Sequence, residues 1–355
     1  MAEKVLMKGN EAIGEAAVVA GCRHYFGYPI TPQSELIEYM AKRLPQVDGV
    51  FLQAESEISA INMVYGAAAA GCRVMTSSSS PGISLKQEGI SYIAGSQLPC
   101  VIVNMQRGGP GLGSIQPGQA DYFQATKGGG HGDYRNIVLA PNSVQEMADI
   151  TVEAFDLADK WRNAVMILGD GALGQMMEPV EFKEKTGALP EKPWAATGLH
   201  GRKKHNVINS LYLQPDLCEK HNHDLQEKFA RIQAEETRWE TLQTDDADII
   251  VVAYGITSRI AQTAIAKARA AGVKVGLFRP ISLWPFPEKP LADLGKTAKS
   301  FVVFEMSAGQ MVEDVKLALN GASPVFFHGR TGGMLPNPKE LFDFIMSVSR
   351  GEGGK

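Results

Sequence analysis

The stretch FLQAESEISAINMVYGAAAAGCRVMTSSSSPG, residues 51–82, decides how the chain folds. Its apolar start predicts a short strand that stops at the acidic pair Glu55 and Glu57, and residues 58–70 are predicted to form a helix. A second strand should then run into a Thr-Ser run, which we expect to form a loop closed by a Pro-Gly pair. Open α/β sheets bind ligands where strands give way to helices, so the two acids stand at a candidate site.

The composition narrows the class of protein. At 355 residues the chain is long enough for about two domains. Its 44% hydrophobic and 21% charged residues are typical of a globular protein. A net charge of −4 gives no indication of a basic surface that would bind nucleic acid. The first residues lack the apolar stretch of a secretory signal, and no run is long enough to span a membrane, so we expect a cytoplasmic protein without membrane contact.

The cysteines argue against a metal or disulfide framework in this chain. Cys22, Cys72, Cys100 and Cys218 are far apart, and no C-x-x-C motif is present. Zinc ribbons and iron–sulfur clusters need closely spaced cysteines. We therefore expect reduced thiols that bind no metal.

Strands and helices alternate in two blocks, which predicts mainly parallel sheets covered on both faces. We expect residues 1–175 to form a doubly wound α/β domain and residues 244–350 a second, smaller α/β domain. Residues 176–243 are interrupted by prolines and predict a connecting segment. This segment contains a charged helix with Leu225, Phe229 and Ile232 along one apolar stripe, which should pack on another part of this chain or on another subunit.

Two prolines bracket a threonine in the run YPITP, residues 28–32. A proline disfavours helical geometry in the residue before it, so Ile30 and Thr31 should form a fixed, non-helical turn. Thr31 also suits the cap of a helix predicted over residues 34–43, and capping does not exclude contact with a ligand.

Arg107 ends an apolar strand and precedes the long glycine-rich run of residues 108–132. A loop of this length inside a domain is usually functional or mobile. The arginine is either an exposed surface charge or a residue whose planar guanidinium binds a carboxylate in a glycine-lined pocket. The glycines do not follow the G-x-G-x-x-G pattern, so they give little support to nucleotide binding.

Two other motifs suggest metal sites only weakly. Gly169-Asp170-Gly171 resembles the start of the diphosphate signature of thiamine diphosphate enzymes, but no asparagine pair stands in the expected window near residues 197–201. We interpret it as a tight turn at a strand end. His221 and His223 are two positions apart and would not face each other on a helix, so they predict a solvated face.

Taken together, these residues resemble the alpha subunit of the 2-oxoacid:ferredoxin oxidoreductases. The 2-oxoisovalerate (3-methyl-2-oxobutanoate) type matches first and 2-oxoglutarate synthase second. The resemblance covers nearly the whole chain and implies a thiamine-diphosphate pyrimidine-type domain followed by a transketolase-C-like domain. The stretches that carry it are residues 28–32, 55–57, 79–82, 107, 131–134, 251–255 and 279–287.

The resemblance implies a reaction and its partners. Such an enzyme oxidatively decarboxylates a 2-oxoacid, here a branched-chain one such as 2-oxoisovalerate, with coenzyme A (CoA) to give acyl-CoA, CO₂ and reduced ferredoxin. Thiamine diphosphate lies between this chain and a beta subunit that holds the diphosphate and Mg²⁺. The 4Fe-4S clusters are expected in partner subunits, which can include gamma and ferredoxin-like delta subunits. No metal is expected in this chain.

The resemblance also implies roles for individual residues near the cofactor. Glu57, rather than Glu55, matches the position that hydrogen-bonds N1′ of the aminopyrimidine, where a carboxyl group helps the 4′-amino group act as an internal base. Ser80 and Gly82 resemble the loop beside the pyrimidine, and Ile30 is expected to contact the cofactor as well.

Three further residues are implied to bind substrate. Thr31 and Arg107 match positions that hold the carboxylate and ketone of the oxoacid. His131 is expected to shape the pocket for the substrate side chain, but it follows three glycines where some relatives carry bulkier residues, which leaves the choice of oxoacid open. The alternatives are a 2-oxoglutarate:ferredoxin oxidoreductase alpha subunit, a non-catalytic assembly subunit, and a stand-alone NAD-linked enzyme.

Overall fold

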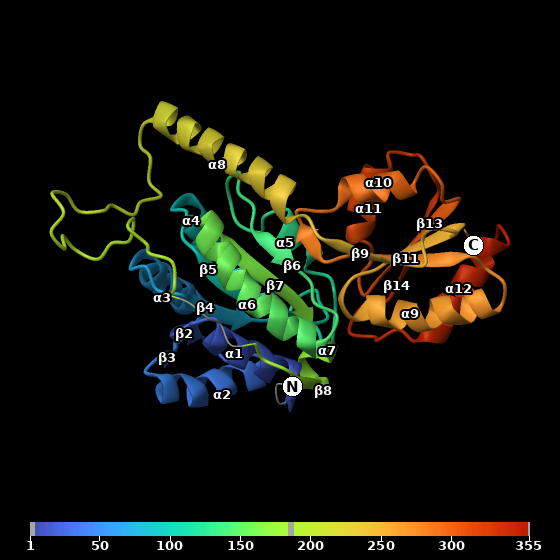
Figure 1. Cartoon of the computed structure of the whole chain (residues 1–355), viewed down its shortest axis with the longest axis horizontal. Helices are drawn as coiled ribbons and strands as arrows, with labels where there is room; N and C mark the ends of the chain where they lie inside the picture. Colours follow the sequence, from blue (N-terminus) through green and yellow to red (C-terminus); the bar gives the residue numbers. More distant parts are fainter. Residues whose placement is uncertain (1–3, 184–187, 354–355) are drawn as a thin grey trace.

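The computed structural model describes residues 4–183 and 188–353, and it consists of two α/β units placed end to end (Figure 1). Residues 184–187 of the predicted connecting segment lie outside the described residues. Each unit has its own sheet, and long helix α8 (Pro215–Glu236) lies along one side of the N-terminal unit. In the described part of the chain, no helix is both long and apolar enough to cross a membrane.

The sheet of the N-terminal unit is mainly parallel, as the alternating pattern predicts. Among the described residues it has seven strands in the order β12-β6-β7-β5-β4-β2-β3, and only β12 runs antiparallel to its neighbour. All residues of β4, β5, β6 and β7 are buried, which is expected when helices cover both faces. The strands are β2 (His24–Gly27), β3 (Val50–Gln53), β4 (Val74–Ser78), β5 (Cys100–Gln106), β6 (Ile137–Leu139), β7 (Ala164–Asp170) and β12 (Ser282–Trp284).

The helices of this unit pack in groups. Helix α1 packs against α2 and α6, whereas α3 packs against α4. The α3–α4 contact is close because glycines of α4 face α3. The bounds are α1 (Gly9–Val19), α2 (Ser34–Arg43), the 3-10 helix η1 (Leu44–Val47), α3 (Glu57–Ala69), α4 (Ser80–Gly95), α5 (Tyr122–Thr126), α6 (Val144–Trp161) and α7 (Gly171–Gln175).

The C-terminal unit is smaller. Its sheet has the order β14-β13-β10-β11-β9 within the described residues, and only the edge strand β9 is antiparallel. Helices α9 and α12 pack together, as do α10 and α11, and the two pairs lie on opposite sides of the strands (Figure 1). The elements are β9 (Trp239–Leu242), β10 (Ile249–Val252), α9 (Gly255–Ala270), β11 (Val275–Pro280), α10 (Glu288–Leu294), β13 (Ser300–Glu305), α11 (Met311–Leu319), β14 (Val325–Gly329) and α12 (Pro338–Ser349).

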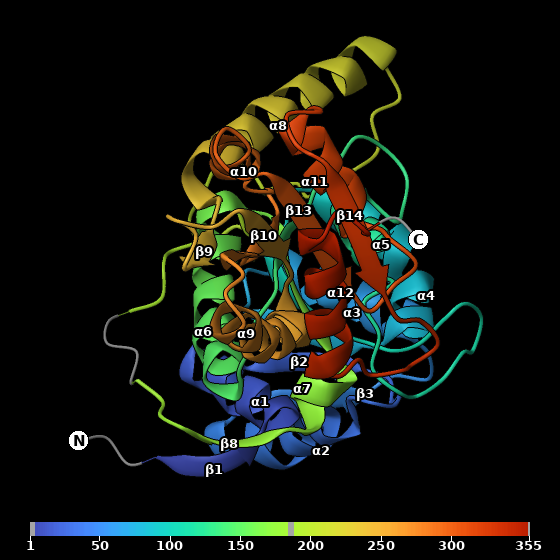
Figure 2. The ribbon, with the colours of Figure 1, turned by 90° about the vertical axis from the view of Figure 1, so that its right-hand side faces the viewer.

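The segment predicted as a connection, residues 176–243, contributes to both units. Strand β8 (Met177–Val180) pairs with β1 (Val5–Lys8) beside the N-terminal unit (Figure 2), whereas β9 joins the sheet of the C-terminal unit. The apolar stripe of α8 is buried against this same chain. Phe229 meets Trp284 edge to face at 5.7 Å, and Trp161 Nε1 donates to Glu236 at 2.8 Å.

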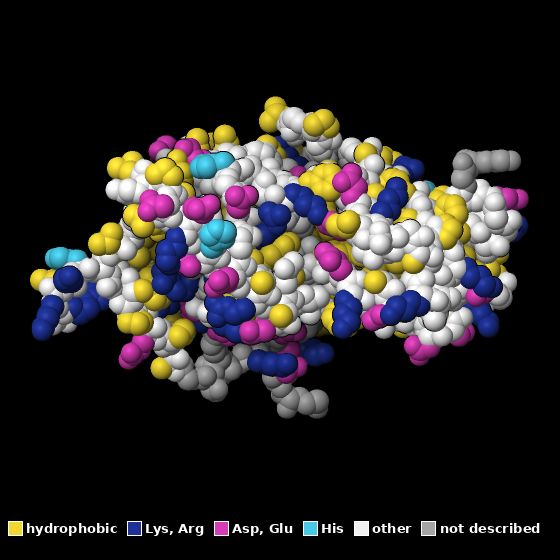
Figure 3. All heavy atoms as spheres, turned by 90° about the horizontal axis from the view of Figure 1, so that it is seen from above, with side chains coloured by type: hydrophobic (Ala, Val, Ile, Leu, Met, Phe, Trp, Pro, Cys, Tyr) yellow, Lys and Arg dark blue, Asp and Glu magenta, His cyan; other side chains and the backbone are white. Residues whose placement is uncertain are grey.

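Residues 193–213 form an arm without helix or strand that extends beyond α3 (Figure 1). Ala196 N donates to Ala69 O at 2.8 Å, and the Arg162 guanidinium lies 4.4 Å from the Trp194 ring, so the base of the arm is attached. Basic side chains gather at its tip (Figure 3), where Lys203 and Lys204 are exposed.

The structure differs from the predicted loop after β4. Helix α4 begins at Ser80, directly after the N-cap residue Ser79, and includes the Pro-Gly pair that we expected to close a loop. Proline is tolerated in the first turn because its missing N–H would have no partner there. Likewise Thr31 does not cap α2, whose N-cap residue is Gln33.

The glycine-rich run after β5 is largely ordered against the C-terminal unit, and it contains the short helix α5. Gln119 Nε2 donates to Tyr254 O at 3.0 Å, and its Oε1 accepts from Met306 N at 2.9 Å. Tyr122 Oη donates to Asp314 at 2.6 Å. These buried hydrogen bonds fix the two units relative to each other.

Candidate cofactor and substrate site

The predicted site residues follow four neighbouring strands. Thr31 comes after β2, Glu57 after β3, Ser80 after β4 and Arg107 after β5. These strands are parallel and adjacent in the order β5-β4-β2-β3, so their carboxyl ends meet at one edge of the sheet. The topology therefore brings residues that are up to 76 positions apart to one place.

The structure separates the roles of the two acids. Glu55 is exposed and hydrogen-bonds to Ser59. Glu57 is the first residue of α3 and is only 6% exposed. Among the described residues, no side chain or backbone group forms a hydrogen bond or ion pair with its carboxylate. A buried carboxylate that accepts no hydrogen bond is costly, which indicates that a ligand completes its surroundings.

Gly82 forms the wall that faces Glu57. A Cβ at this position would lie 2.1 Å from Ser78 Oγ and 2.6 Å from Glu57 Oε1, so no other residue fits without movement. The side-chain hydroxyls of Ser78 and Ser79 are buried, and neither has a hydrogen-bond partner within the described part of the chain. A carboxylate and two hydroxyls with unused hydrogen-bonding capacity thus lie around the start of α4.

Arg107 is held next to the turn that contains Thr31. Its Nη1 donates to Thr31 O and its Nη2 to Leu112 O, both at 3.0 Å, and the residue is 7% exposed. Its Nε is buried and has no partner among the described residues. The Thr31 residue is exposed, and Ile30 O accepts from Gln33 N at 3.2 Å in the same non-helical turn. The guanidinium is therefore oriented by backbone carbonyls and keeps an N–H available.

Sequence reasoning missed Asp121, which joins this group from the glycine-rich run. Ser80 Oγ donates to Asp121 at 2.7 Å, Asn104 Nδ2 donates to it at 2.9 Å, and Arg107 N donates to Ser80 Oγ at 3.1 Å. Burial raises the pKa of Asp121, while the bonds from Ser80 and Asn104 and the Arg107 charge oppose that rise. No periodicity or motif marks Asp121, because its position depends on how the loop folds back.

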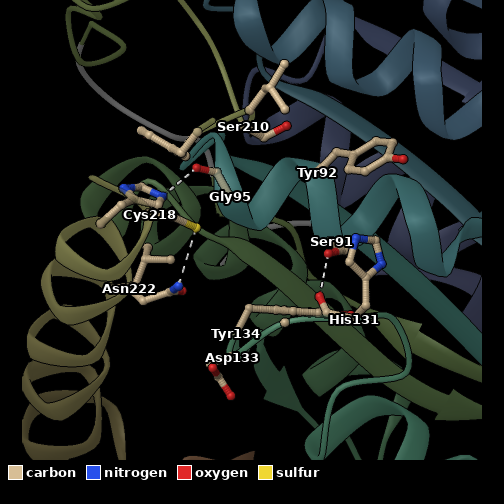
Figure 4. Close-up of a pocket in the computed structure, with 14 residues that line it drawn as sticks. Ser91, Tyr92, Gly95, His131, Asp133, Tyr134, Ser210, Cys218 and Asn222 are labelled. Atoms are coloured by element: carbon tan, nitrogen blue, oxygen red, sulfur yellow. Dashed lines mark hydrogen bonds between the residues drawn. The ribbon is translucent and has the colours of Figure 1, made fainter. Parts of the chain in front are cut away.

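His131 lies apart from these residues. It borders a pocket of about 510 Å³ between α4 and α8 (Figure 4), where its ring meets Tyr92 edge to face at 5.9 Å. Ser91 Oγ donates to His131 O at 2.6 Å. Ser91 stands 11 positions after Ser80 on α4, which corresponds to about 16 Å along a helix. The structure thus brings Ile30, Thr31, Glu57, Ser80, Gly82 and Arg107 together, but not His131.

The residues of the two weaker metal motifs make other contacts in the structure. Asp170 caps α7 by accepting from Ala172 N at 2.9 Å and Leu173 N at 3.1 Å, and burial raises its pKa to about 6. His221 is half-buried rather than solvated, since its Nε2 lies 2.8 Å from Gly95 O and its ring stacks on Tyr212. Among the described residues, no group of three or more His, Cys, Asp and Glu side chains could hold a metal ion.

Family models account for most of the chain. Residues 15–238 match the model described as pyruvate flavodoxin/ferredoxin oxidoreductase, thiamine diphosphate-binding, and residues 247–341 match core domain II of pyruvate:ferredoxin oxidoreductase. The chain is 52% identical over 345 residues to the ketoisovalerate oxidoreductase subunit VorB of Methanothermobacter marburgensis, with 97% of each chain covered. The chain belongs to the 2-oxoacid:ferredoxin oxidoreductases. It is therefore a subunit of an oxidoreductase with a thiamine diphosphate-binding domain.

Two further members of this family are less similar to the chain. The 2-oxoglutarate synthase subunit KorA of the same organism is 37% identical over 384 residues, covering 98% of this chain and all of KorA. The solved 2-oxoglutarate:ferredoxin oxidoreductase from Magnetococcus marinus, with 2-oxoglutarate, coenzyme A and succinyl-CoA bound, has a TM-score of 0.83 at 27% identity. The match covers 98% of this oxidoreductase subunit and 65% of that longer chain.

The contact between Gly82 and Glu57 can be tested with a matched pair of glycines. Gly82→Ala should weaken thiamine diphosphate binding by the assembled enzyme at least about tenfold, because the added Cβ displaces the Glu57 carboxylate and losing a hydrogen bond to a charged group costs about 1.5–3 kcal/mol. Gly66→Ala on α3, where no atom lies within 4 Å of the added Cβ, should leave binding unchanged. Calorimetric titration of both variants measures this, and equal affinities would contradict the assigned contact.

Proposed function

We propose that this subunit supplies the pyrimidine side of a thiamine diphosphate site, in an enzyme that oxidatively decarboxylates a branched-chain 2-oxoacid such as 2-oxoisovalerate. With coenzyme A, the products are acyl-CoA, CO₂ and reduced ferredoxin. The observation that carries the proposal is the buried Glu57 carboxylate, which faces Gly82 and accepts no hydrogen bond in the described part of the chain.

The residues present suit the aminopyrimidine of thiamine diphosphate. Glu57 can accept a hydrogen bond from a ring nitrogen, and the N-terminus of α3 favours its negative charge. Gly82 leaves room for a flat ring beside it, and the unpartnered hydroxyls of Ser78 and Ser79 can bond to ring substituents or to water. When bound, thiamine diphosphate supplies the nucleophilic carbon that adds to the oxoacid ketone. Glu57 would hold the proton at the ring nitrogen during this chemistry.

Arg107 and Thr31 are suited to the substrate carboxylate. A guanidinium held by the Thr31 and Leu112 carbonyls is already oriented before substrate arrives, so little ordering remains to be done on binding. Its free Nε–H and the exposed Thr31 can donate to an oxoacid. The presence of these groups together at one edge of the sheet supports a catalytic subunit rather than a subunit that serves only in assembly. His131, at the far end of α4, has no part in this proposal.

The proposal places the diphosphate on a partner. Asp170, the aspartate of the motif that resembles a diphosphate signature, is buried as the cap of α7. A beta subunit would therefore hold the diphosphate and Mg²⁺. The 4Fe-4S clusters would also lie in partners, which could include gamma and ferredoxin-like delta subunits. The higher identity to the ketoisovalerate oxidoreductase subunit, 52% against 37% for a 2-oxoglutarate synthase subunit, favours a branched-chain substrate.

A panel of oxoacids tests the substrate assignment. With the purified complex, coenzyme A and a viologen acceptor, kcat/KM should be at least about tenfold higher for 2-oxoisovalerate than for 2-oxoglutarate. A site for a branched aliphatic side chain has to be apolar, and a second carboxylate would lose its solvation there. Pyruvate serves as the small reference substrate. A preference for 2-oxoglutarate would contradict the branched-chain assignment and support the synthase alternative.

The two acids provide a test of the cofactor assignment. Glu57→Gln should lower oxoacid-dependent viologen reduction by at least about 100-fold, since an amide cannot hold the proton at the ring nitrogen. Glu55→Gln, two positions away and exposed, should retain activity within about twofold because its bond to Ser59 is on the surface. If Glu57→Gln kept activity within a few-fold, the role assigned to Glu57 would be wrong.

A further inference from the structure

A buried lysine lies between two points at which α3 and α4 touch. The first contact joins Gly82 and Glu57, and the second joins Gly89 and Ile61, where a Cβ on the glycine would come within 2.5 Å of Ile61 Cγ2. Lys86 stands four residues after Gly82 and three before Gly89, so it lies on the same face of α4 as both glycines. Helical side chains lean toward the N-terminus, which directs Lys86 toward the Gly82–Glu57 contact.

The Lys86 side chain is fully buried and fixes the end of β4. Its Nζ donates to Thr76 Oγ1 at 2.5 Å and to Ser77 O at 3.1 Å. Ser77 Oγ in turn donates to Gln33 Oε1 and lies 2.5 Å from Tyr25 Oη. The lysine therefore holds the two residues that precede Ser78, the side chain closest to Gly82.

The groups around Lys86 leave one anion near it. Cys100 of β5 and Tyr25 of β2 are buried, and burial raises the pKa of both, that of Cys100 to about 12, so both stay neutral. Glu57 of α3 contributes a carboxylate that interacts with the Lys86 charge. Burial lowers the pKa of Lys86 to about 7, and Glu57 opposes that change. Lys86 thus carries its charge below about pH 7 and loses it as the pH rises further.

We propose that Lys86 is a positioning residue for the reaction, whose buried ammonium provides the countercharge that keeps Glu57 ionised before the cofactor binds. The inference rests on the proposed role of Glu57. Without the ammonium, a buried carboxyl group takes up a proton more readily, because only the charged form suffers from burial. Lys86 acts through Glu57 and through the end of β4, and it does not touch substrate.

The test compares the protonation of Glu57 with and without the lysine charge. Lys86→Met keeps the length of the side chain and removes the ammonium. Infrared difference spectra of the cofactor-free complex against the corresponding Glu57→Gln variant isolate the carboxyl band of Glu57. The midpoint of its pH titration should rise by at least about one pH unit in Lys86→Met, as expected when a neighbouring opposite charge is lost.

Lys228→Met is the matched control. Lys228 of α8 is also buried, its pKa is likewise lowered by burial to about 7, and its Nζ donates to Arg162 O at 3.2 Å, but Glu57 is not among the charges that act on it. This variant should leave the Glu57 midpoint unchanged. Should Lys86→Met fail to assemble, Lys86→Gln, which can still donate to Thr76, takes its place with the same expected rise.

The outcomes separate the two proposals. An unchanged Glu57 midpoint in the Lys86 variant, with Glu57→Gln inactive, would overturn the role of Lys86 and leave that of Glu57 intact. An active Glu57→Gln enzyme would instead overturn the proposed function, whatever the titration shows. An equal rise in Lys228→Met would also overturn the inference, because a general effect of removing a buried lysine would then explain it.

Discussion

The close approach of α3 and α4 is the constraint on which the site depends. Two glycines on one face of α4 have no Cβ, so Glu57 and Ile61 of α3 can lie directly against that helix. Any larger residue at position 82 would push the Glu57 carboxylate away from the edge of the sheet. The same geometry encloses Lys86 between the two contacts, where its charge has no access to water. Packing and electrostatics at the site therefore come from the same feature of the sequence, a helix that begins directly after β4 and presents glycine, lysine and glycine to its neighbour.

A second constraint holds the substrate side of the site. The glycine-rich run leaves β5 at Arg107, returns to pair near Pro117, and then bonds to the C-terminal unit through Gln119 and Tyr122. Strand β12, which lies in sequence between β11 and β13 of the C-terminal unit, adds to the sheet of the N-terminal unit. The two units are thus joined by backbone pairing and by buried hydrogen bonds. A loop fixed at both ends can hold the Arg107 guanidinium in one orientation, which a mobile glycine-rich loop could not do.

Local patterns in the sequence were sufficient for the alternating elements. They also marked Thr31, the acidic pair and Arg107 as residues that follow strands, and residues that follow adjacent parallel strands must meet. The choice of Glu57 over Glu55 came only from the family resemblance. The helix over residues 34–43 agrees with α2. The start of α4 was missed because Pro81 reads as a break, although proline is tolerated in a first turn. Strands β9 and β12 pair with distant segments, so no local pattern in the sequence marks them. Asp121 reaches the site only when the loop folds, so it has no local signal either. Lys86 was missed since a lone lysine in a helix ordinarily faces water.

The central claim is that Glu57 receives the cofactor ring while a partner holds the diphosphate. A cryo-electron microscopy structure of the assembled enzyme with thiamine diphosphate tests both parts at once. We expect a Glu57 carboxylate oxygen within about 3 Å of a pyrimidine ring nitrogen, the distance of a hydrogen bond. We also expect the beta subunit to bind the diphosphate and its Mg²⁺. A pyrimidine ring bound away from Glu57, or a diphosphate held at Asp170 of this chain, would contradict this arrangement.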